Sequence, residues 1–529
     1  MVDISSSLLA SAVVILLAPG LVAQDPIYSF PGGSTKDYAG SAVNSAGDFN
    51  GDGIREIVVG AYGDDSAGKL AGSATVYSGL GGVRLYTFLG SSVGAGFGRA
   101  VAAAGDVNGD GFGDLIVGAP LDNSTGWAAG SAWVYSGWDG SLLRSIYGDG
   151  VGDDFGRAVC GLGDLDGDGF GDFLVAASET AYGGGDSGYA RVYSGVDGSL
   201  LHSLTGGAAL DGFGISAAPA GDLDHDGLTD FVIGADKQDG NGSAAGAVYA
   251  YSGATAALLF TAFGDAAGDG FGGAVAGGRD FSGDGVPDLV VGAPQVLSGG
   301  AGYVRVLSGA GGAPLYTLRG VAAHDKFGRA VAVIGDADGD GDPDLAVGTT
   351  ESGNGLRAGS VRVYDGASGA HVYSVHGAAA GDQLGHSLAG VGDLDFNGKD
   401  DLLVGAPYAD VHGADSGQAL VVGHSSPTLI GPFPGTAGSV NTLHASGLPA
   451  HAKVYFLRGS ARGLTPSPSC STLFADLADP KVISSTTADA LGNAFVSGFV
   501  PGGMAGTTLL LQAFAPAACK VSNLVVKTF

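Results

Sequence analysis

The stretch that decides the fold reads GDVNGDGFGDLIVGA and runs from Gly105 to Ala119. It begins as an acidic, glycine-rich loop and ends as an apolar run typical of a β-strand. With small variations the pattern occurs seven times, at intervals of 56 to 58 residues. A period of this length indicates that each copy is one supersecondary unit of a repeat architecture. The first acidic residues of the seven copies are Asp48, Asp106, Asp164, Asp222, Asp280, Asp336 and Asp393.

Each repeat contains four short runs rich in Val, Leu, Ile, Tyr and Phe, which are separated by turns of Gly, Asp and Asn. In the second repeat these runs are Gly98–Gly105, Asp114–Ala119, Gly130–Gly137 and Leu142–Gly148. Four strands in each of seven units predict an all-β fold, a seven-bladed β-propeller. An open solenoid or a string of hairpins is the alternative.

The two ends of the repeat region favour a closed ring. The fourth-strand run follows each of the first six repeats, but no copy follows the third run of the seventh, Gly417–His424. A copy stands instead before the first repeat, at Ile27–Gly32. We therefore expect this N-terminal strand to complete the last blade, which leaves no unpaired sheet edge between the first and last blades.

The charge of the chain is strongly negative, since 53 Asp and Glu stand against 23 Lys and Arg, a formal net charge of −30. This balance excludes nucleic-acid binding as the default interpretation, because that function requires a basic surface. It favours a metal cation as the partner of the carboxylates. Apolar residues make up 45% of the chain, which supplies a core and argues against disorder.

The acidic loops carry the candidate metal ligands. Ca²⁺ takes about six to eight oxygen ligands, and a tight loop supplies them from side chains at positions 1, 3, 5 and 9 and a backbone carbonyl at position 7. All seven loops have glycine at position 6, which permits a sharp turn. The predicted ligand sets are Asp48, Asn50, Asp52, Ile54 and Glu56; Asp106, Asn108, Asp110, Phe112 and Asp114; Asp164, Asp166, Asp168, Phe170 and Asp172; Asp222, Asp224, Asp226, Leu228 and Asp230; Asp280, Ser282, Asp284, Val286 and Asp288; Asp336, Asp338, Asp340, Asp342 and Asp344; and Asp393, Asp395, Asn397, Lys399 and Asp401.

The predicted ion is Ca²⁺, up to seven per chain and one in each blade. The sets contain 24 carboxylates, and in an empty loop three or four negative charges would repel one another. Mg²⁺ is disfavoured because it requires stricter octahedral geometry. An EF-hand is disfavoured because Val59 and Val117 stand at position 12 of the first two copies, where that motif has Glu. Solvated acidic turns without an ion are the remaining alternative.

Three features together resemble FG-GAP repeats, the blades of the integrin α-subunit N-terminal propeller and of related bacterial surface proteins. They are the Phe-Gly landmark that precedes most loops, the Asp-rich loop itself and a Val-Gly-Ala-Pro tail, as at Val117–Pro120, Val291–Pro294 and Val404–Pro407. The resemblance covers about residues 24–426. It implies a Ca²⁺-stiffened, non-enzymatic propeller that serves as a binding or adhesion scaffold. In integrin α chains only some blades carry the cation loop, and the resemblance does not extend to the integrin leg domains or an inserted I domain, so heterodimerisation is not implied.

A partner surface is expected on the face opposite the acidic loops. The second-to-third-strand loops and the blade-to-blade linkers lie there, with the aromatic residues Tyr62, Trp127, Tyr182 and Tyr408. Aromatic side chains on rigidly held loops are suitable contact anchors. We expect an extracellular protein or glycan ligand at this face; the alternative is that these aromatics only pack against neighbouring loops.

The rival hypothesis is an extracellular enzyme, a lyase or hydrolase, with its site in the central funnel of the propeller. Such a site should break the repeat symmetry with convergent His, Tyr, Arg or Lys. The sequence shows irregular basic residues, namely Lys237, Arg279, Lys326 and Arg357, and a histidine group, His371, His376 and His386. Surface histidines are the simpler interpretation of that group. A purely structural envelope component is a third possibility.

The two ends of the chain carry separate predictions. Residues 1–23 are expected to be a signal peptide that ends in Leu21-Val22-Ala23, and the mature chain is expected to have no transmembrane segment and to be secreted, at the cell surface or periplasmic. Residues 427–529 hold short alternating runs and predict a small β-sandwich. In an exported chain Cys470 and Cys519 are a plausible disulfide, whereas Cys160 is expected to be a small buried residue.

Overall fold

The computed structural model describes residues 26–178, 187–351 and 357–423, and beyond them only the backbone of strands. No α-helix occurs within the described ranges, and the first 28 strands form seven antiparallel four-stranded sheets. In six of these sheets the strands are consecutive in sequence, and in the seventh the order is β1-β28-β27-β26. The prediction of an all-β, seven-bladed propeller is confirmed.

The strands of the blades have the following bounds. Blade 1 contains β2 (Ala42–Gly47), β3 (Glu56–Ala61), β4 (Ser73–Tyr77) and β5 (Arg84–Leu89); blade 2 contains β6 (Ala100–Gly105), β7 (Asp114–Ala119), β8 (Ser131–Tyr135) and β9 (Leu142–Tyr147); blade 3 contains β10 (Ala158–Gly163), β11 (Asp172–Ala177), β12 (Tyr189–Tyr193) and β13 (Leu200–Thr205); blade 4 contains β14 (Phe213–Gly221), β15 (Asp230–Ala235), β16 (Ala247–Tyr251) and β17 (Leu258–Phe263); blade 5 contains β18 (Ala274–Arg279), β19 (Asp288–Ala293), β20 (Tyr303–Leu307) and β21 (Pro314–Arg319); blade 6 contains β22 (Val331–Ile334), β23 (Asp344–Thr349), β24 (Ser360–Asp365) and β25 (His371–His376); blade 7 contains β26 (Ser387–Gly392), β27 (Asp401–Ala406), β28 (Gln418–Val422) and β1 (Pro26–Pro31).

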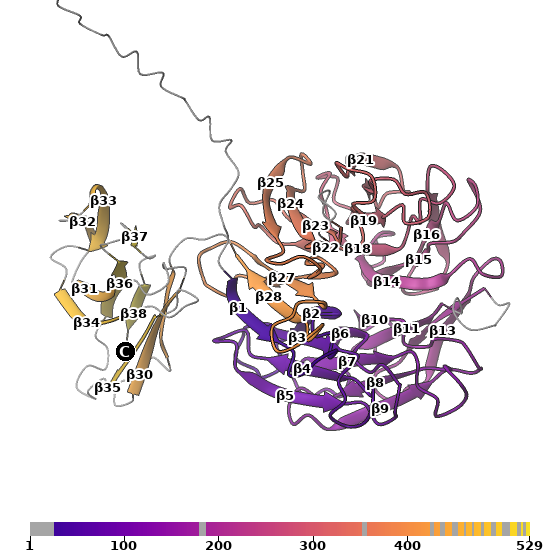
Figure 1. The fold of residues 1–529 in the computed structure, drawn as a ribbon, viewed down its shortest axis with the longest axis horizontal. Coiled ribbons are helices and arrows are strands. Elements are labelled where there is room, and N and C mark those ends of the chain that lie inside the picture. Colours follow the sequence, from indigo (N-terminus) through magenta and orange to yellow (C-terminus); the bar gives the residue numbers. More distant parts are fainter. Residues whose placement is uncertain are drawn as a thin grey trace, which may run out of the picture.

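The ring closes through the N-terminal strand, as the sequence predicts. β1 pairs with β28 in antiparallel register, from Pro26 opposite Val422 to Pro31 opposite Gln418. The innermost strands of neighbouring blades contact one another around the ring, and β26 of the last blade contacts β2 of the first. Figure 1 shows β1 in indigo beside β27 and β28 in orange, where the two ends of the propeller sequence meet.

The core consists of layers between the blades. The second strand of every blade is buried along its whole length, as in β7. The landmark aromatic residues, such as Phe155 and Phe271, are fully buried. Phe155 forms a bridge with Gly130 at the start of the third strand in the preceding blade. Equivalent bridges at six of the seven landmark positions join blades to their predecessors; Phe213, which leads into blade 4, has none among the described residues.

Close backbone approach explains the glycine of the Val-Gly-Ala tail. A Cβ atom added at Gly118 would lie 2.0 Å from the carbonyl oxygen of Gly156 in the next blade, and one at Gly405 would lie 2.0 Å from that of Gly40, across the closure. Blade 3 departs from this rule because Ala176 occupies the position. The first strand of the next blade, β14, differs from the other first strands. It begins at the landmark Phe213, and its register shifts before Ser216.

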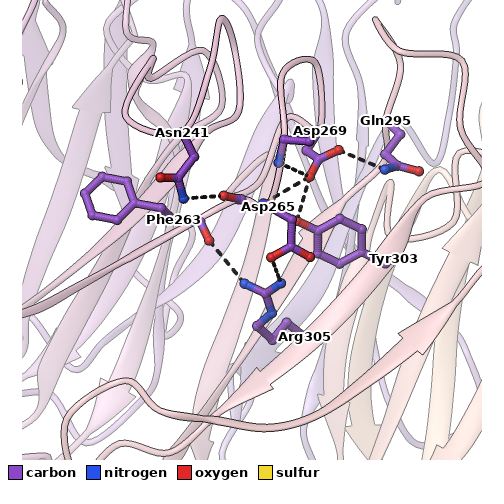
Figure 2. Close-up of polar contacts among 9 residues, drawn as sticks. Asn241, Phe263, Asp265, Asp269, Gln295, Tyr303 and Arg305 are labelled. Atoms are coloured by element: carbon purple, nitrogen blue, oxygen red, sulfur yellow. Dashed lines mark hydrogen bonds and ion pairs between the residues drawn. The ribbon is translucent and has the colours of Figure 1, made fainter.

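The linkers that lead into several blades are held by a buried aspartate two residues before the landmark aromatic. In blade 5 this residue is Asp269, whose Oδ2 accepts hydrogen bonds from the Tyr303 hydroxyl at 3.0 Å and from the Asp265 N–H at 3.1 Å. Its Oδ1 accepts a bond of 2.8 Å from Gln295 Nε2 (Figure 2). One carboxylate therefore ties the linker to two other segments of the same blade.

Arg305 adds an ion pair to this linker. Its guanidinium lies 2.6 Å from Asp265 and donates a hydrogen bond of 3.1 Å to the carbonyl oxygen of Phe263 (Figure 2). Blade 3 repeats both contacts, since Arg191 forms an ion pair with Asp149 and the Tyr189 hydroxyl donates a bond of 2.8 Å to Asp153. The same contacts in two blades show that the outer polar layer follows the repeat as well as the core does.

Strands continue beyond the ring. The backbone contains β29 (Thr428–Phe433), β30 (Val440–Ser446), β31 (Lys453–Gly459), β32 (Arg462–Ser467), β33 (Cys470–Leu477), β34 (Lys481–Thr487), β35 (Ala494–Phe499), β36 (Thr508–Ala515), β37 (Lys520–Val521) and β38 (Val525–Thr528), in sheets of three, five and two strands. A β-sandwich over 427–529 stays a prediction.

Three other predictions concern single segments or residues. The signal peptide, 1–23, and the pairing of Cys470 with Cys519 lie outside the described residues. Cys160 is a free, buried thiol, as predicted, and burial raises its pKa to about 12. In the described part of the chain no helix has the length and apolar character needed to cross a membrane.

Candidate metal loops and the central cavity

Backbone N–H groups hold the acidic side chains of every loop in the same way. The N–H of the glycine at position 6 donates a hydrogen bond of 2.7–3.0 Å to the aspartate at position 1 in all seven loops. The N–H at position 7 donates one of 2.8–2.9 Å to the side chain at position 5. The repeated sequence thus produces one repeated loop geometry.

The glycine at position 6 is required by backbone conformation. Its φ lies between 84° and 99° in the seven loops, a region that L-residues rarely adopt. A Cβ there would meet no atom within 4 Å, so crowding is not the reason. Position 4 also has positive φ in every loop, even where it is His225 or Phe396. Sequence analysis missed this second turn residue, although glycine occupies it in the other five loops.

The acidic residue at position 9 begins the second strand of its blade and is completely buried in all seven blades. Its carboxylate accepts a hydrogen bond of 2.5–2.8 Å from the N–H at position 2. In blades 2 to 5 its other oxygen accepts a second bond, of 2.8–3.1 Å, from a glycine N–H after the third strand. In blades 6 and 7 the corresponding oxygens, Oδ1 of Asp344 and of Asp401, are buried with no hydrogen-bond partner among the described residues.

Burial makes ionisation of these carboxylates unfavourable. Desolvation, with repulsion from the other acids of the loop, raises the pKa of Glu56, Asp114 and Asp344 to about 7 each. The pKa of Asp401 is raised well above its ordinary value for the same reasons. A bound cation would offset both the desolvation and the repulsion.

At least four loops bring three carboxylates together. Oxygens of positions 1, 3 and 9 lie within 4.8 Å of one another in blades 3, 4 and 6, and those of positions 1, 5 and 9 do so in blade 5. The partnerless oxygens of Asp344 and Asp401, together with a third on Asp48, are further acceptors that no protein donor reaches among the described residues. The donor set is entirely oxygen, which is what Ca²⁺ prefers. The residues present therefore fit such an ion.

Blade 6 contains one more carboxylate than the sequence analysis included. Asp365, at the end of β24, forms a second group with Asp338 and Asp340. In blade 2 the corresponding residue is Ser136, whose hydroxyl donates a bond of 3.2 Å to Asp110. The replacement of a recurring serine by aspartate was visible in the sequence, and it places a charge where blades 1 to 5 have a hydroxyl.

The aromatic residues of the opposite face do not form one group. Tyr62 and Tyr408 both contact Tyr38, at ring distances of 4.9 and 5.6 Å, so they pack against a neighbouring loop. Trp127 is exposed to 54%. Tyr182 lies outside the described residues.

The histidines and irregular basic residues from the sequence are not all gathered at one site. His371 and His376 lie at the two ends of the outer strand β25, where both are exposed. Lys326 and Arg357 form ion pairs with Glu351, at 2.9 and 3.3 Å. Among the three histidines only His386 lies in the interior of the ring, where it lines a central cavity.

The central cavity has a volume of about 370 Å³ and is lined from every blade. Each blade contributes the residue that follows its landmark dipeptide, and the second-to-third-strand loops add Tyr62, Asp236 and Tyr408. The sequence analysis did not assign a role to these positions. The residues after the landmark are, in blade order, Ser41, Arg99, Arg157, Ile215, Gly273, Arg329 and His386.

Comparison with known proteins supports the resemblance stated from the sequence. Six segments match the FG-GAP repeat model, at residues 39–77, 97–135, 213–251, 271–307, 327–364 and 384–422. Blade 3 is not among these segments, although it has the same four strands. The chain thus carries FG-GAP repeats in a seven-bladed ring.

Relatives among curated proteins are integrin α chains. The chain is 34% identical to integrin alpha-V of Gallus gallus over 214 residues, which are 37% of this chain and 20% of the relative. It is 36% identical to integrin alpha-E of Mus musculus over 168 residues (29% and 14%) and 40% identical to human integrin alpha-7 over 138 residues (24% and 11%). The matches therefore span a fifth or less of these relatives.

Proposed function

We propose that this FG-GAP repeat propeller is an exported scaffold that binds Ca²⁺ in its seven acidic loops and recognises a protein or glycan partner on the opposite face. The observation that supports it most strongly is the completely buried acid at position 9 of every blade. An isolated carboxylate in such a position is unfavourable, whereas one that binds a divalent cation is stabilised. The integrin α relatives are consistent with a binding role.

Within each loop, the side chains at positions 1, 3, 5 and 9 and the carbonyl at position 7 would hold the ion. The ion would supply positive charge to the acidic cluster and join the first strand, the loop and the second strand of the blade. Because binding favours the folded state, it stabilises that state by mass action. In a scaffold, bound ions would also restrict the motion of the acidic loops.

Metal analysis and thermal melting test the calcium proposal. We expect up to seven Ca²⁺ per chain in purified protein and a lower melting temperature after EGTA, restored by added Ca²⁺ and far less by Mg²⁺. Protein that contains no calcium, or that melts identically with and without EGTA, would contradict the proposal.

Two exposed tryptophans of blade 2 test which face binds the partner. Trp127 lies in the second-to-third-strand loop, opposite the acidic loops, whereas Trp138 follows the third strand on the acidic-loop side and contacts Phe112 at a ring distance of 4.8 Å. Screening against extracellular proteins and glycan arrays would identify a ligand. Trp127→Ala should then weaken binding and Trp138→Ala should not; the reverse result would assign the partner to the other face.

Export and domain organisation belong to the same proposal. We infer a signal peptide at 1–23, a propeller domain at 24–426 and a C-terminal module at 427–529, with a disulfide between Cys470 and Cys519. Mass spectrometry of the exported protein should find Gln24 at the N-terminus and one disulfide. A retained leader or two free C-terminal thiols would contradict these assignments.

An enzyme with its site in the central cavity is the second candidate, because that cavity gathers His386, Tyr62 and Tyr408 with arginines, the convergence expected of a catalytic funnel. A panel of polysaccharide and phosphoester substrates tests it. Turnover that His386→Ala abolishes would favour the enzyme over the binding scaffold.

A further inference from the structure

The central cavity breaks the symmetry of the ring in one specific way. The position after the landmark dipeptide is equivalent in all seven blades, yet it is arginine in blades 2, 3 and 6 and histidine in blade 7. In a chain of net charge −30, three of the cationic side chains therefore line one cavity on the ring axis. Nothing in the packing of the blades requires a cation there, because isoleucine and glycine occupy the same position in blades 4 and 5.

The arginines are weakly neutralised. The guanidinium groups of Arg157 and Arg329 have no hydrogen bond or ion pair among the described residues, while that of Arg99 lies 4.8 Å from the ring centre of Tyr62. Asp236 is the single acidic side chain that lines the cavity. The buried Asp154, outside this lining, also interacts electrostatically with Arg99 and Arg157. Two carboxylates against three guanidinium groups still leave a net positive charge.

Electrostatic strain within the cluster is visible in the pKa values. Burial and the positive charges of Arg99 and Arg329 lower the pKa of Arg157 to about 10. Burial, followed by the neighbouring arginines, lowers the pKa of His386 to about 3, so its ring is neutral. The cluster is thus destabilised by itself and would be relieved by a negative charge.

Further observations suggest how a ligand would be held. Nδ1 of His386 is buried without a hydrogen-bond partner among the described residues, and a protonated ring nitrogen can donate to an oxyanion. Oδ1 of Asp236 is also buried without a partner, but as a carboxylate oxygen it would repel the ligand and so places it on the arginine side of the cavity. A second cavity, of about 280 Å³, adjoins the first, because Arg157 and Arg329 line both. Its remaining lining is mostly Ala and Val from the innermost strands. The guanidinium groups therefore border an apolar space, where charge interactions are stronger than in water.

We propose that the central cavity binds an oxyanion, a carboxylate, sulfate or phosphate group, between the guanidinium groups of Arg157 and Arg329, with Arg99 as a further donor. The planar fork of arginine matches the paired oxygens of such groups. The cavity has the size of a small-molecule site. The site depends on closure of the ring and not on ions in the acidic loops.

Sulfate is the probe for this site, because phosphate and citrate remove calcium by precipitation or chelation. Titration of calcium-loaded full-length protein with sodium sulfate, against sodium chloride of equal ionic strength, should show saturable binding by calorimetry and a higher melting temperature. Arg157→Gln and Arg329→Gln should each weaken binding about tenfold or more, since each removes a charged hydrogen bond. Arg319→Gln, on the exposed end of an outer strand, should leave it unchanged.

The variants also report on folding. Since Arg157→Gln and Arg329→Gln remove repulsion, both should melt in chloride at or above the wild-type temperature.

A blocked pentapeptide with one central Asp, compared with its Asn counterpart, distinguishes an acidic side chain on a partner from a free anion. The proposal is supported if sulfate binds, or if only the Asp peptide binds, provided that the binding depends on Arg157 and Arg329. No saturable binding of either, or binding that both variants retain, would overturn it.

Discussion

The hydroxyl of Tyr303 donates a hydrogen bond of 3.0 Å to Asp269, a buried carboxylate in the linker that leads into the same blade. Tyr303→Phe removes this donor and leaves the acceptor buried. We expect the free energy of unfolding to fall by about 1–2 kcal/mol, measured by urea denaturation in calcium. Tyr147→Phe is the control, because the Tyr147 hydroxyl has no hydrogen bond among the described residues. Equal losses in the two variants would contradict this role.

Asp344→Asn should have opposite effects with and without calcium. The asparagine oxygen can accept the N–H of Ala337, as Oδ2 of Asp344 does at 2.8 Å, while its amide replaces the partnerless Oδ1. With calcium, one site should be lost and the melting temperature should fall. Without calcium, removal of a desolvated charge should leave the melting temperature equal to or above that of the wild type at pH above 7. Asp139→Asn, in an exposed turn of blade 2, is the control for charge alone.

Calcium-free protein should become less stable as pH rises from about 4 to about 8. The pKa values of Glu56, Asp114 and Asp344 are about 7 in the folded chain, against ordinary values of 4.5 for Glu and 3.8 for Asp. Between these values the folded state binds more protons than the unfolded state, so stability falls with pH. Melting curves in resin-stripped buffers test this.

Saturating calcium should abolish the pH dependence, because the ion keeps the carboxylates ionised in the folded state. Calcium binding near neutral pH should accordingly release protons, measured by calorimetry in buffers of different ionisation enthalpy. Stability that rises with pH in the calcium-free protein would show that these carboxylates are not desolvated as described.

Gly60→Ala should disrupt the contact between the first two blades. The new Cβ would lie 2.0 Å from the carbonyl oxygen of Gly98, a backbone atom that cannot move independently. We expect a loss of about 3 kcal/mol or more in the free energy of unfolding, or failure to fold. Gly207→Ala, where a Cβ meets no atom within 4 Å, should be nearly neutral. A stable Gly60→Ala protein would show that the blades can separate at this point.

The sequence predicted what depends on local pattern. The turn at Gly111, the apolar run after Asp114 and the closing strand at Ile27 each follow from neighbouring residues repeated at a fixed interval, and the structure has seven blades closed by β1. Burial of Cys160 followed from the small residues at its position in other repeats.

The central cavity could not be predicted in the same way. Arg99, Arg157 and Arg329 all follow a Phe-Gly landmark, but the motif alone does not show that this position faces the axis of the ring. Only closure of the ring brings the residue after each landmark to a common axis. An alignment of the seven repeats by position, rather than by motif, would have shown that this position varies where its neighbours do not.

The pairing of β1 with β28 also sets when and how the ring can open. During synthesis β1 is made long before β28, so Pro26 can pair with Val422 only when nearly the whole propeller has been made. Until then the hydrophobic surface around Ile27 and Phe30 stays uncovered. In the finished molecule the chain enters and leaves the ring at the same end of this ladder. Tension between the two flanking segments would act on one residue pair at a time. The strands would therefore separate in order, beginning with the pair of Pro26 and Val422.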